Sequence, residues 1–409
     1  MIIKEKLSGY LDISILVLFT LQISSLNFSI ALSSISFVLW LLLWLYKITL
    51  IKKINIGSAL KTEIKYVLIF IGLFILFDFI SRMVGGFQAS SVEGLRRHLL
   101  FAVFLFTVFS INSRERLLKV ITIIFIVTAL ISLYELIIYS TSVQELMKQK
   151  EWGYIRIDYF THPLTQGQIK MLVLLFMLPL LFSKEKLPVN RKILLALLVP
   201  IFISMFLTQS RNVYLGFGAA LIIYGFIENK KLLAIFVVCA VAFWFIAPEN
   251  FKSRIESIVD INQPSNRARI EMWKVSKDIF LDYPFFGLGE RVHHFEEIYS
   301  QYKKIDPENW GEGTHLHNNL LMIVVQFGIF GLAAFMGIFI SIFLKQIKFY
   351  RLEQDRLNKL IILGSILVMV SFHIAGIFDY NYRDQKIAPF LLFFIAIPFT
   401  IFKLRNRDG

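Results

Sequence analysis

Cysteine is almost absent from the sequence, since Cys239 is the only one among 409 residues. A single cysteine cannot form a disulfide within the chain, and a metal site built on cysteine ligands is not expected. Acidic residues are also outnumbered, with 29 Asp and Glu against 43 Lys and Arg, for a net charge of +14. The basic residues lie between apolar runs and form no basic domain. The charge excess therefore indicates membrane topology and not nucleic-acid binding.

Strict alternation of polar and apolar residues is missing as well, which argues against a membrane β-barrel. Apolar runs recur from end to end instead: 56% of the residues are hydrophobic, 41 are Phe, and the mean hydropathy is +0.66. Many runs approach the roughly 20 residues that cross a bilayer. We predict an all-α polytopic membrane protein with about 12 transmembrane helices, at approximately 10–26, 28–46, 64–81, 98–111, 118–139, 168–183, 192–208, 213–227, 232–247, 318–344, 358–378 and 387–402.

The distribution of basic residues predicts the orientation. If both termini are cytoplasmic, the cytoplasmic segments carry 24 of the 43 Lys and Arg, as the positive-inside rule requires. The first apolar run has a basic lead and no cleavage pattern, so we expect a retained anchor. The chain has no visible repeat and is predicted to be one membrane domain over residues 1–409. Its main outer loop lies at about 248–315, between the ninth and tenth spans.

This outer loop is expected to be helical. In residues 269–282, Ile270, Trp273 and Ile279 are spaced as on an amphipathic helix, and the sequence YPFFGLGE then ends it. A second outer loop, about 140–167, contains Arg156 and His162 among aromatic residues, which either belong to an interfacial belt or line a site.

Several polar residues next to apolar spans lie on the predicted outer face, and their presence there calls for a structural or functional explanation. Ser210 and Arg211 lie in a tight connection between two spans, where a guanidinium is suited to phosphate oxygens or, alternatively, anchors a helix end to lipid. Arg267 and Arg269 lie at the start of the loop helix, where a helix N-terminus also attracts anions. Either of these two could be the working arginine, and both could instead be ordinary solvated residues. We prefer Arg269.

A pair of histidines precedes the tenth span. His315 and His317 are two residues apart, so on a helix they would point to different faces and at most one would aim inward. Histidine suits general base work on a hydroxyl. A metal site would need a third ligand, for which Glu312, His293 and His294 are available without any selective spacing. A histidine that takes no part is the remaining alternative.

Two further groups of charged residues lack an evident reason. Asp379, Arg383 and Asp384 lie in the outer turn between the last two spans, where they either orient the site or solvate the turn. Asp78 lies inside the third span, where an ionisable residue is costly, and the sequence assigns it no partner.

Taken together, these residues resemble motifs of the O-antigen ligase and polymerase superfamily of bacterial membrane glycosyltransferases. One motif is His317-Asn318 followed after nine residues by Gly328-x-x-Gly331. The two glycines are expected to let the helix that carries His317 pack closely against a neighbour.

Further motifs occur in the same order as in that superfamily. These are Ser210-Arg211 at the end of a span, Arg269 separated by three residues from Trp273, the segment Pro284-x-x-Gly287-x-Gly289, and His162-Pro163. The motifs cover about residues 150–332.

The resemblance implies a C-type glycosyltransferase fold with a periplasmic active site in the bacterial inner membrane. The implied partners are a glycan donor on undecaprenyl diphosphate, a lipid A-core acceptor and membrane lipids, with no cofactor and no metal. His317 would activate the acceptor hydroxyl, while Arg211 and Arg269 would hold the diphosphate. The resemblance and the position of these residues together make the following residues candidates for binding substrate: Arg156, His162, Arg267, His315, Asn318 and Asp379.

Other functions remain open from the sequence. Polymerases of the superfamily use a second lipid-linked glycan as acceptor, and its protein-modifying members usually carry an extra C-terminal domain. A transporter or flippase would show similar halves and midplane polar residues, whereas a transferase should show a lateral lipid groove beside Arg211 and His317. The sequence does not indicate an oligomeric state.

Overall fold

The computed structural model describes residues 2–51, 58–148, 156–182, 190–228, 230–247, 249–289, 291, 295–302 and 315–406. Within these ranges the chain is helical and contains no β-strand, as the all-α prediction requires. The helices are α1 (Ile2–Ser25), α2 (Ile30–Ile51), α3 (Ser58–Val84), α4 (Ala89–Arg96), the 3₁₀ helix η1 (Arg97–Leu100), α5 (Phe101–Ser110), α6 (Arg114–Lys148), α7 (Pro163–Leu181), α8 (Arg191–Leu207), α9 (Arg211–Ile227), α10 (Lys230–Ile246), α11 (Glu249–Glu256), α12 (Pro264–Asp282), α13 (Phe295–Tyr302), α14 (Asn319–Leu352), α15 (Arg356–Ala375) and α16 (Ile387–Arg405).

Eight helices of the described chain are long and apolar enough to cross a membrane: α1, α2, α3, α6, α7, α14, α15 and α16. A helix is also present at each of the other four predicted spans, but these helices are shorter. Helix α5 has 10 residues, while α8, α9 and α10 have 17 each. At about 1.5 Å per residue, 17 residues fall slightly short of a hydrocarbon core of about 30 Å. A multi-pass membrane protein is therefore supported, and the number twelve stays a prediction.

The most buried of the apolar helices lie in the middle of the bundle. The membrane-length windows of α7, α15 and α16 are 83%, 72% and 89% buried, whereas that of α2 is only 22% buried. A helix that is apolar on all sides is stable in the centre of a bundle, where every face packs on another helix. Phenylalanine rings fill this centre, as in the stacked pair Phe176 and Phe394 with centroids 4.4 Å apart. The outer helices expose their apolar side chains to lipid.

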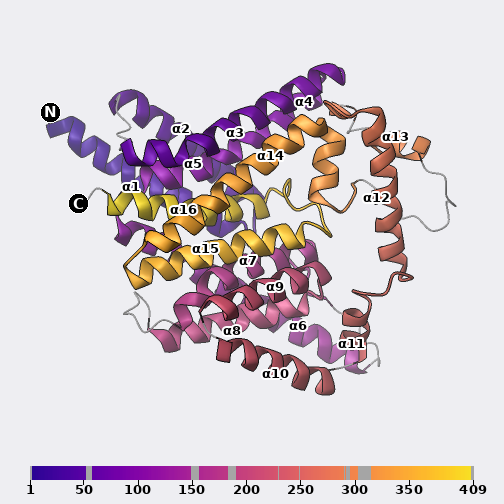
Figure 1. Ribbon diagram of the computed structural model, residues 1–409. Helices are drawn as coiled ribbons and strands as arrows, with labels where there is room; N and C mark the ends of the chain where they lie inside the picture. Colours follow the sequence, from indigo (N-terminus) through magenta and orange to yellow (C-terminus); the bar gives the residue numbers. More distant parts are fainter. Residues whose placement is uncertain are drawn as a thin grey trace.

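Figure 1 shows the long helices lying side by side, with both chain termini at one end of the bundle and α12 across the opposite end. The predicted amphipathic helix at 269–282 is confirmed as α12, which starts five residues earlier at Pro264. It buries Met272, Val275 and Ile279 against α14 and the segment before it. All three described helices of the outer loop, α11, α12 and α13, lie at this end of the bundle.

Helix α14 is broken at Gly328, whose φ of +67° belongs to the left-handed region. The turn after α12 fits into this break. Ile329 N–H donates to Pro284 O over 2.8 Å, and Leu288 N–H donates to Val325 O over 2.8 Å. A Cβ on Gly328 would lie 2.1 Å from Phe285 O, so only glycine is accommodated. The expectation that Gly328 and Gly331 serve helix–helix packing is therefore corrected: Gly328 admits a turn of the outer loop.

Candidate active site

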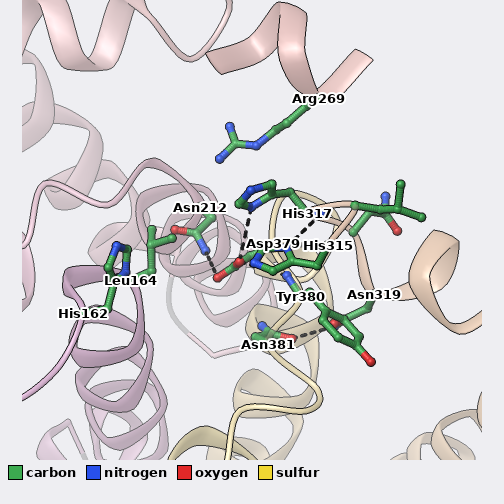
Figure 2. A network of polar contacts seen from close by, with 12 residues as sticks. His162, Leu164, Asn212, Arg269, His315, His317, Asn319, Asp379, Tyr380 and Asn381 are labelled. Atoms are coloured by element: carbon green, nitrogen blue, oxygen red, sulfur yellow. Dashed lines mark hydrogen bonds and ion pairs between the residues drawn. The ribbon is translucent and has the colours of Figure 1, made fainter. Parts of the chain in front are cut away.

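Five segments deliver polar side chains to the end of the bundle beneath α12. They are the N-termini of α7 and α9, the residues before α14, the turn between α15 and α16, and α12 itself. Figure 2 shows these residues around the carboxylate of Asp379. Residues from Gln168 to Asn381 thus meet in one place, although they are far apart in the sequence.

Asp379 is the centre of this network and is only 8% exposed. Its Oδ2 accepts hydrogen bonds from Gln168 Nε2 over 2.8 Å and from Asn212 Nδ2 over 3.3 Å. Its Oδ1 accepts the backbone N–H of Tyr380 over 2.9 Å and lies 3.8 Å from His317 Nδ1. The carboxylate is therefore held in place from several sides. Of the two sequence interpretations, the structure supports orientation of the site and not solvation of the turn.

Asp379 is ionised in this setting. Burial alone would raise the pKa of its carboxyl, but the contact with the His317 imidazole and the backbone N–H of Tyr380 hold the pKa below its ordinary value. A buried carboxylate that receives this many donors favours its charged form. A fixed negative charge therefore faces His317.

His315 and His317 lie side by side, contrary to the expectation that they face apart. The segment is not helical, because α14 begins only at Asn319, and the two rings have centroids 4.1 Å apart. His315 Nδ1 accepts the backbone N–H of His317 over 3.3 Å. Burial, followed by the nearby charge of His317, lowers the pKa of His315 to about 4, so this ring is neutral at neutral pH.

His317 adopts a backbone conformation that is unusual for a residue with a side chain, with a φ of +46°. Such strain is concentrated at functional sites, where the surrounding structure maintains it. Its Nδ1 faces Asp379, and its side chain is 30% exposed. When Nδ1 carries the proton, Nε2 presents a lone pair on the other edge of the ring, which is the arrangement of an oriented general base.

Asn318 is committed to the protein itself. Its Oδ1 accepts Leu321 N–H over 3.1 Å as the N-cap of α14, and its Nδ2 donates to Ile377 O over 3.0 Å. Asn319 Nδ2 in turn donates to Asn381 Oδ1 over 2.5 Å. These amides join the start of α14 to the turn that carries Asp379. Both contacts of Asn318 lie within the protein and position the start of α14, while its predicted contact with substrate stays a prediction.

Arg211 is the first residue of α9 and connects the bundle to the outer helices. Its Nη1 donates to Ser257 O over 2.8 Å, and its Nη2 donates to Ser265 Oγ over 2.5 Å. Gln209, two residues earlier, has a φ of +49°. The guanidinium is thus fixed at the junction of α11 and α12, beside the N-terminus of α12.

Arg269 is half-buried and points from α12 toward His317 and Asp379 (Figure 2). Its Nη1 has one long contact, 3.5 Å from Asn266 Oδ1, and its buried Nε has no hydrogen-bond partner. Arg267, by contrast, is exposed. Trp273, one turn along α12, donates from Nε1 to Leu316 O over 3.2 Å and so positions the histidine segment.

Arg254 on α11 was not predicted from the sequence. It donates to Gln209 O over 3.3 Å and lies close enough to Arg211 and Arg269 to act on their charges. Arg156 also joins this group: it donates to Thr208 O over 2.8 Å. Four guanidinium groups thus converge, and the only buried carboxylate that acts on Arg269 is Asp379 among the described residues. A lone arginine in a polar loop gives no sequence signal, because only the tertiary structure brings it here.

A groove of about 180 Å³ lies beside these arginines. Arg211, Asn212, Asn266 and Arg269 form its polar part. Its remaining lining is apolar and comes from α9, α12 and the segments around them: Leu215, Ile258, Val259, Ile261, Ile270, Trp273 and Phe378. Val259 and Ile261 are 82% and 67% exposed, so the apolar side faces outward. The groove therefore combines cations with a surface suited to lipid chains.

Two predicted features do not join this centre. His162 is exposed and caps α7 by accepting Leu164 N–H over 3.3 Å, away from Asp379 (Figure 2). Glu312, His293 and His294, named as ligands of an alternative metal site, lie outside the described residues. Within the described part of the chain, no three His, Cys, Asp or Glu side chains come together to hold a metal ion.

Comparison with known proteins supports the resemblance seen in the sequence. Residues 193–336 match the sequence model of a family described as O-Antigen ligase. The match includes Arg211, Arg269, His317 and the α14 break. The chain is also 31% identical over 193 residues to the teichuronic acid biosynthesis protein TuaE of Bacillus subtilis (strain 168). That stretch covers 42% of this chain and 37% of the relative, so the chain matches well under half of the relative's length. The predicted resemblance is confirmed at this level.

Proposed function

Starting from this match to the O-antigen ligase family, we propose that the protein is a membrane glycosyltransferase that moves a glycan from a lipid diphosphate to an acceptor hydroxyl. The observation that carries the proposal is the grouping of His317, whose Nδ1 lies 3.8 Å from Asp379 Oδ1, with the half-buried Arg269, whose Nε has no partner. A base and a fixed cation at one apolar-walled groove are what such a transfer needs.

The proposed reaction is a single displacement. The acceptor hydroxyl oxygen attacks the anomeric carbon of the donor and forms the new glycosidic bond, while its proton passes to Nε2 of His317. The bond from the anomeric carbon to the phosphate oxygen breaks, and the electron pair leaves with the diphosphate. Attack from the opposite side inverts the anomeric configuration. Asp379 stabilises the imidazolium that forms, as a buried carboxylate does in other base-assisted transfers.

The arginines supply charge for the departing diphosphate. Arg269 is directed to the site with hydrogen-bonding capacity to spare, whereas Arg211 already donates to Ser257 and Ser265. We therefore assign Arg269 direct contact with the phosphates. Arg211 would contribute its charge and fix the N-terminus of α12, where free N–H groups also attract anions.

For the acceptor, we propose lipid A-core, which makes the protein an O-antigen ligase of the bacterial inner membrane with both termini cytoplasmic. A polymerase that adds the glycan to a second lipid-linked glycan is the other candidate. The name of the relative favours the polymerase, because that name refers to teichuronic acid biosynthesis and not to lipid A. The donor in both cases would be a glycan on undecaprenyl diphosphate.

A transporter or flippase would need a cavity open to either side of the membrane. The groove beside Arg211 lies instead at the end of the bundle opposite the chain termini, which favours a transferase. The location of the other polar residues at the same end supports the same assignment (Figure 2).

The test is complementation of a strain that lacks its O-antigen ligase, followed by transfer with purified protein and a lipid diphosphate-linked glycan. Loss of the base in His317→Ala should lower the transfer rate about 10²–10⁴-fold. Loss of the cation in Arg269→Ala should lower it about 10²–10³-fold. Polymer formed only on the lipid diphosphate would move the assignment to polymerase.

Two matched substitutions serve as controls for these variants. Arg267→Ala removes an exposed arginine two residues from Arg269, and His162→Ala removes an exposed histidine at the same end of the bundle. Both variants should keep more than half of the transfer rate. Full transfer by His317→Ala would exclude the catalytic role that we give to His317. An Arg267→Ala defect as large as that of Arg269→Ala would move the phosphate contact to Arg267.

A further inference from the structure

A second group of arginines lies at the same end of the bundle, around the turn that carries Asp379. It consists of Arg82 on α3, Arg97 at the start of η1 and Arg383 in the turn between α15 and α16. Arg82 and Arg383 both lie close enough to Arg97 to act on its charge. None of these residues lines the groove beside Arg211.

The one buried carboxylate of this group is Asp78, which the sequence left without a partner. Its Oδ1 accepts a hydrogen bond from Arg82 Nε over 2.7 Å, and its Oδ2 lies 2.6 Å from His98 Nε2. Asp78 and Arg82 are both 0% exposed. This carboxylate is therefore already neutralised by Arg82 and His98.

Arg97 and Arg383 are left with a surplus of positive charge. Arg383 Nη1 donates to the neutral Gln326 Oε1 over 3.1 Å, and Arg97 Nε is buried without a hydrogen-bond partner. In the part of the chain that the structure describes, no carboxylate forms an ion pair with either residue. Two half-buried guanidinium groups that repel each other are costly unless an anion joins them.

Arg97 borders a cavity that can hold such an anion together with a lipid chain. The cavity has a volume of about 170 Å³ and extends from Arg96 and Arg97 along the α1–α2 hairpin, past Phe37. The apolar wall continues onto the surface, because Ile30 and Val38 are 44% and 52% exposed. The cavity is therefore basic at one end and uncharged along its length, where apolar residues lie beside Gln22, Ser33, Ser34 and Gln385.

Arg383 lines a second, smaller cavity of about 30 Å³, which shares Arg97 and Leu100 with the larger one. The turn from Asp379 to Arg383 leads from this smaller cavity to the candidate active site. Tyr380 N–H donates to Asp379 Oδ1 over 2.9 Å, while the ring of Tyr380 lies 6.1 Å from that of His315. The Tyr380 hydroxyl and Arg383 both reach Gln326 Oε1, over 3.5 and 3.1 Å. In space, Gln326, Tyr380 and His315 therefore lie between a ligand head group at Arg383 and the proposed base His317.

From this juxtaposition we propose that the cavity beside Arg97, together with the smaller cavity between Arg97 and Arg383, is the acceptor site, and that it takes an anionic amphiphile whose head group bears phosphate. The proposal rests on the proposed function, and it gives each substrate its own arginines and its own apolar wall. The donor occupies the groove between α9 and α12, beside Arg269. The acceptor enters along α1 and α2, and its hydroxyl reaches His317 past Tyr380.

The test counts bound amphiphiles on the purified full-length protein in a neutral maltoside detergent. Didecanoyl phosphatidic acid serves as the probe, and native mass spectrometry gives the number bound per chain. The wild type should bind two molecules. Arg97→Gln and Arg383→Gln should each weaken one of the two binding events about 10- to 100-fold, which corresponds to the loss of charge-assisted hydrogen bonds. Arg269→Gln should weaken the other event.

Four controls make the outcome decisive. Arg97→Lys keeps the charge and should bind more tightly than Arg97→Gln, while Arg116→Gln removes a cation at the opposite end of the bundle and should still bind two molecules. Thermal unfolding of each variant separates misfolding from lost binding. Inorganic phosphate at the same concentration should not displace the probe. Two molecules bound by Arg97→Gln, or displacement of the probe by inorganic phosphate, would overturn the proposal.

Transfer kinetics give a second readout once an acceptor is in hand. Arg97→Gln should raise KM for the acceptor about 10-fold or more and leave KM for the donor unchanged, since the loss is confined to one site. Arg269→Gln should change the donor parameters instead. A change in the donor KM alone in Arg97→Gln would contradict the assignment. Binding of two probe molecules by a protein without any transfer would mean that the proposed function fails while the second site stands.

Discussion

Replacement of Asp379 by Asn tests whether the site is organised around a charge or around a shape. The variant keeps the size of the side chain and removes the negative charge opposite His317. In the wild type both carboxylate oxygens accept hydrogen bonds, Oδ2 from Gln168 and Asn212 and Oδ1 from Tyr380 N–H. Whichever way the new amide is turned, its NH₂ group faces a donor. The substitution therefore always leaves a buried N–H donor facing another donor, without an acceptor.

The expected magnitudes follow from these contacts. A buried donor without an acceptor costs about 1–3 kcal/mol of stability. Loss of the carboxylate also removes the charge that stabilises the imidazolium and the group that selects the tautomer of His317. Replacement of the equivalent carboxylate in a serine-protease triad costs about 10⁴-fold in rate. Since Asp379 Oδ1 lies 3.8 Å from His317 Nδ1, beyond hydrogen-bond length, we expect a smaller loss of about 10²–10³-fold.

The assay is glycan transfer by the purified variant, alongside its thermal unfolding. Asp384→Asn is the matched control, because Asp384 lies in the same turn and accepts Thr165 Oγ1 over 2.7 Å without contacting His317. Its stability should fall by a similar amount, while its transfer rate should stay within about threefold of the wild type. A folded Asp379→Asn protein that transfers within threefold of the wild type would refute the reasoning.

Three further predictions concern stability. Gly289→Ala should destabilise the protein by about 2–5 kcal/mol, because Gly289 has a φ of +57° and a Cβ would lie 2.0 Å from Ser81 O; thermal unfolding measures this. Burial holds the pKa of His315 at about 4, so the unfolded chain takes up a proton that the folded chain does not. Stability should therefore fall as the pH drops from about 6.5 to about 4, by at most about 3 kcal/mol, and His315→Gln should flatten this dependence in unfolding temperature against pH. Lys170→Met should cost about 3–5 kcal/mol, because it leaves Glu135 buried without its ion-pair partner at 2.6 Å, and adding Glu135→Leu should restore most of the unfolding temperature.

Much of the architecture follows from local properties of the sequence. Apolar runs and amphipathic spacing located the spans and α12, since both signals arise within one helix. The approximate places of Arg211 and Arg269 at helix starts were also predictable, because Ser210, Pro264 and the surrounding composition mark those starts.

Features that depend on tertiary contacts could not be predicted in this way. Asp78 and Arg82 are four residues apart on one helix, so their ion pair could have been predicted from the sequence. The contact of His98 with Asp78, in contrast, forms only because the fold brings η1 next to α3. The two histidines were expected to face apart because a helix was assumed for them, whereas the cap at Asn318 delays the helix past both.

The insertion of the outer-loop turn into the break of α14 has a consequence for motion. Opening α12 as a lid would require breaking two backbone hydrogen bonds between the turn after α12 and α14, from Leu288 N–H to Val325 O and from Ile329 N–H to Pro284 O. Helix α11, in contrast, is joined to the bundle through side chains such as Arg254. Amide exchange should therefore be slow at Leu288 and Ile329 and faster in α11, which makes α11 the part of this outer cover that opens most readily.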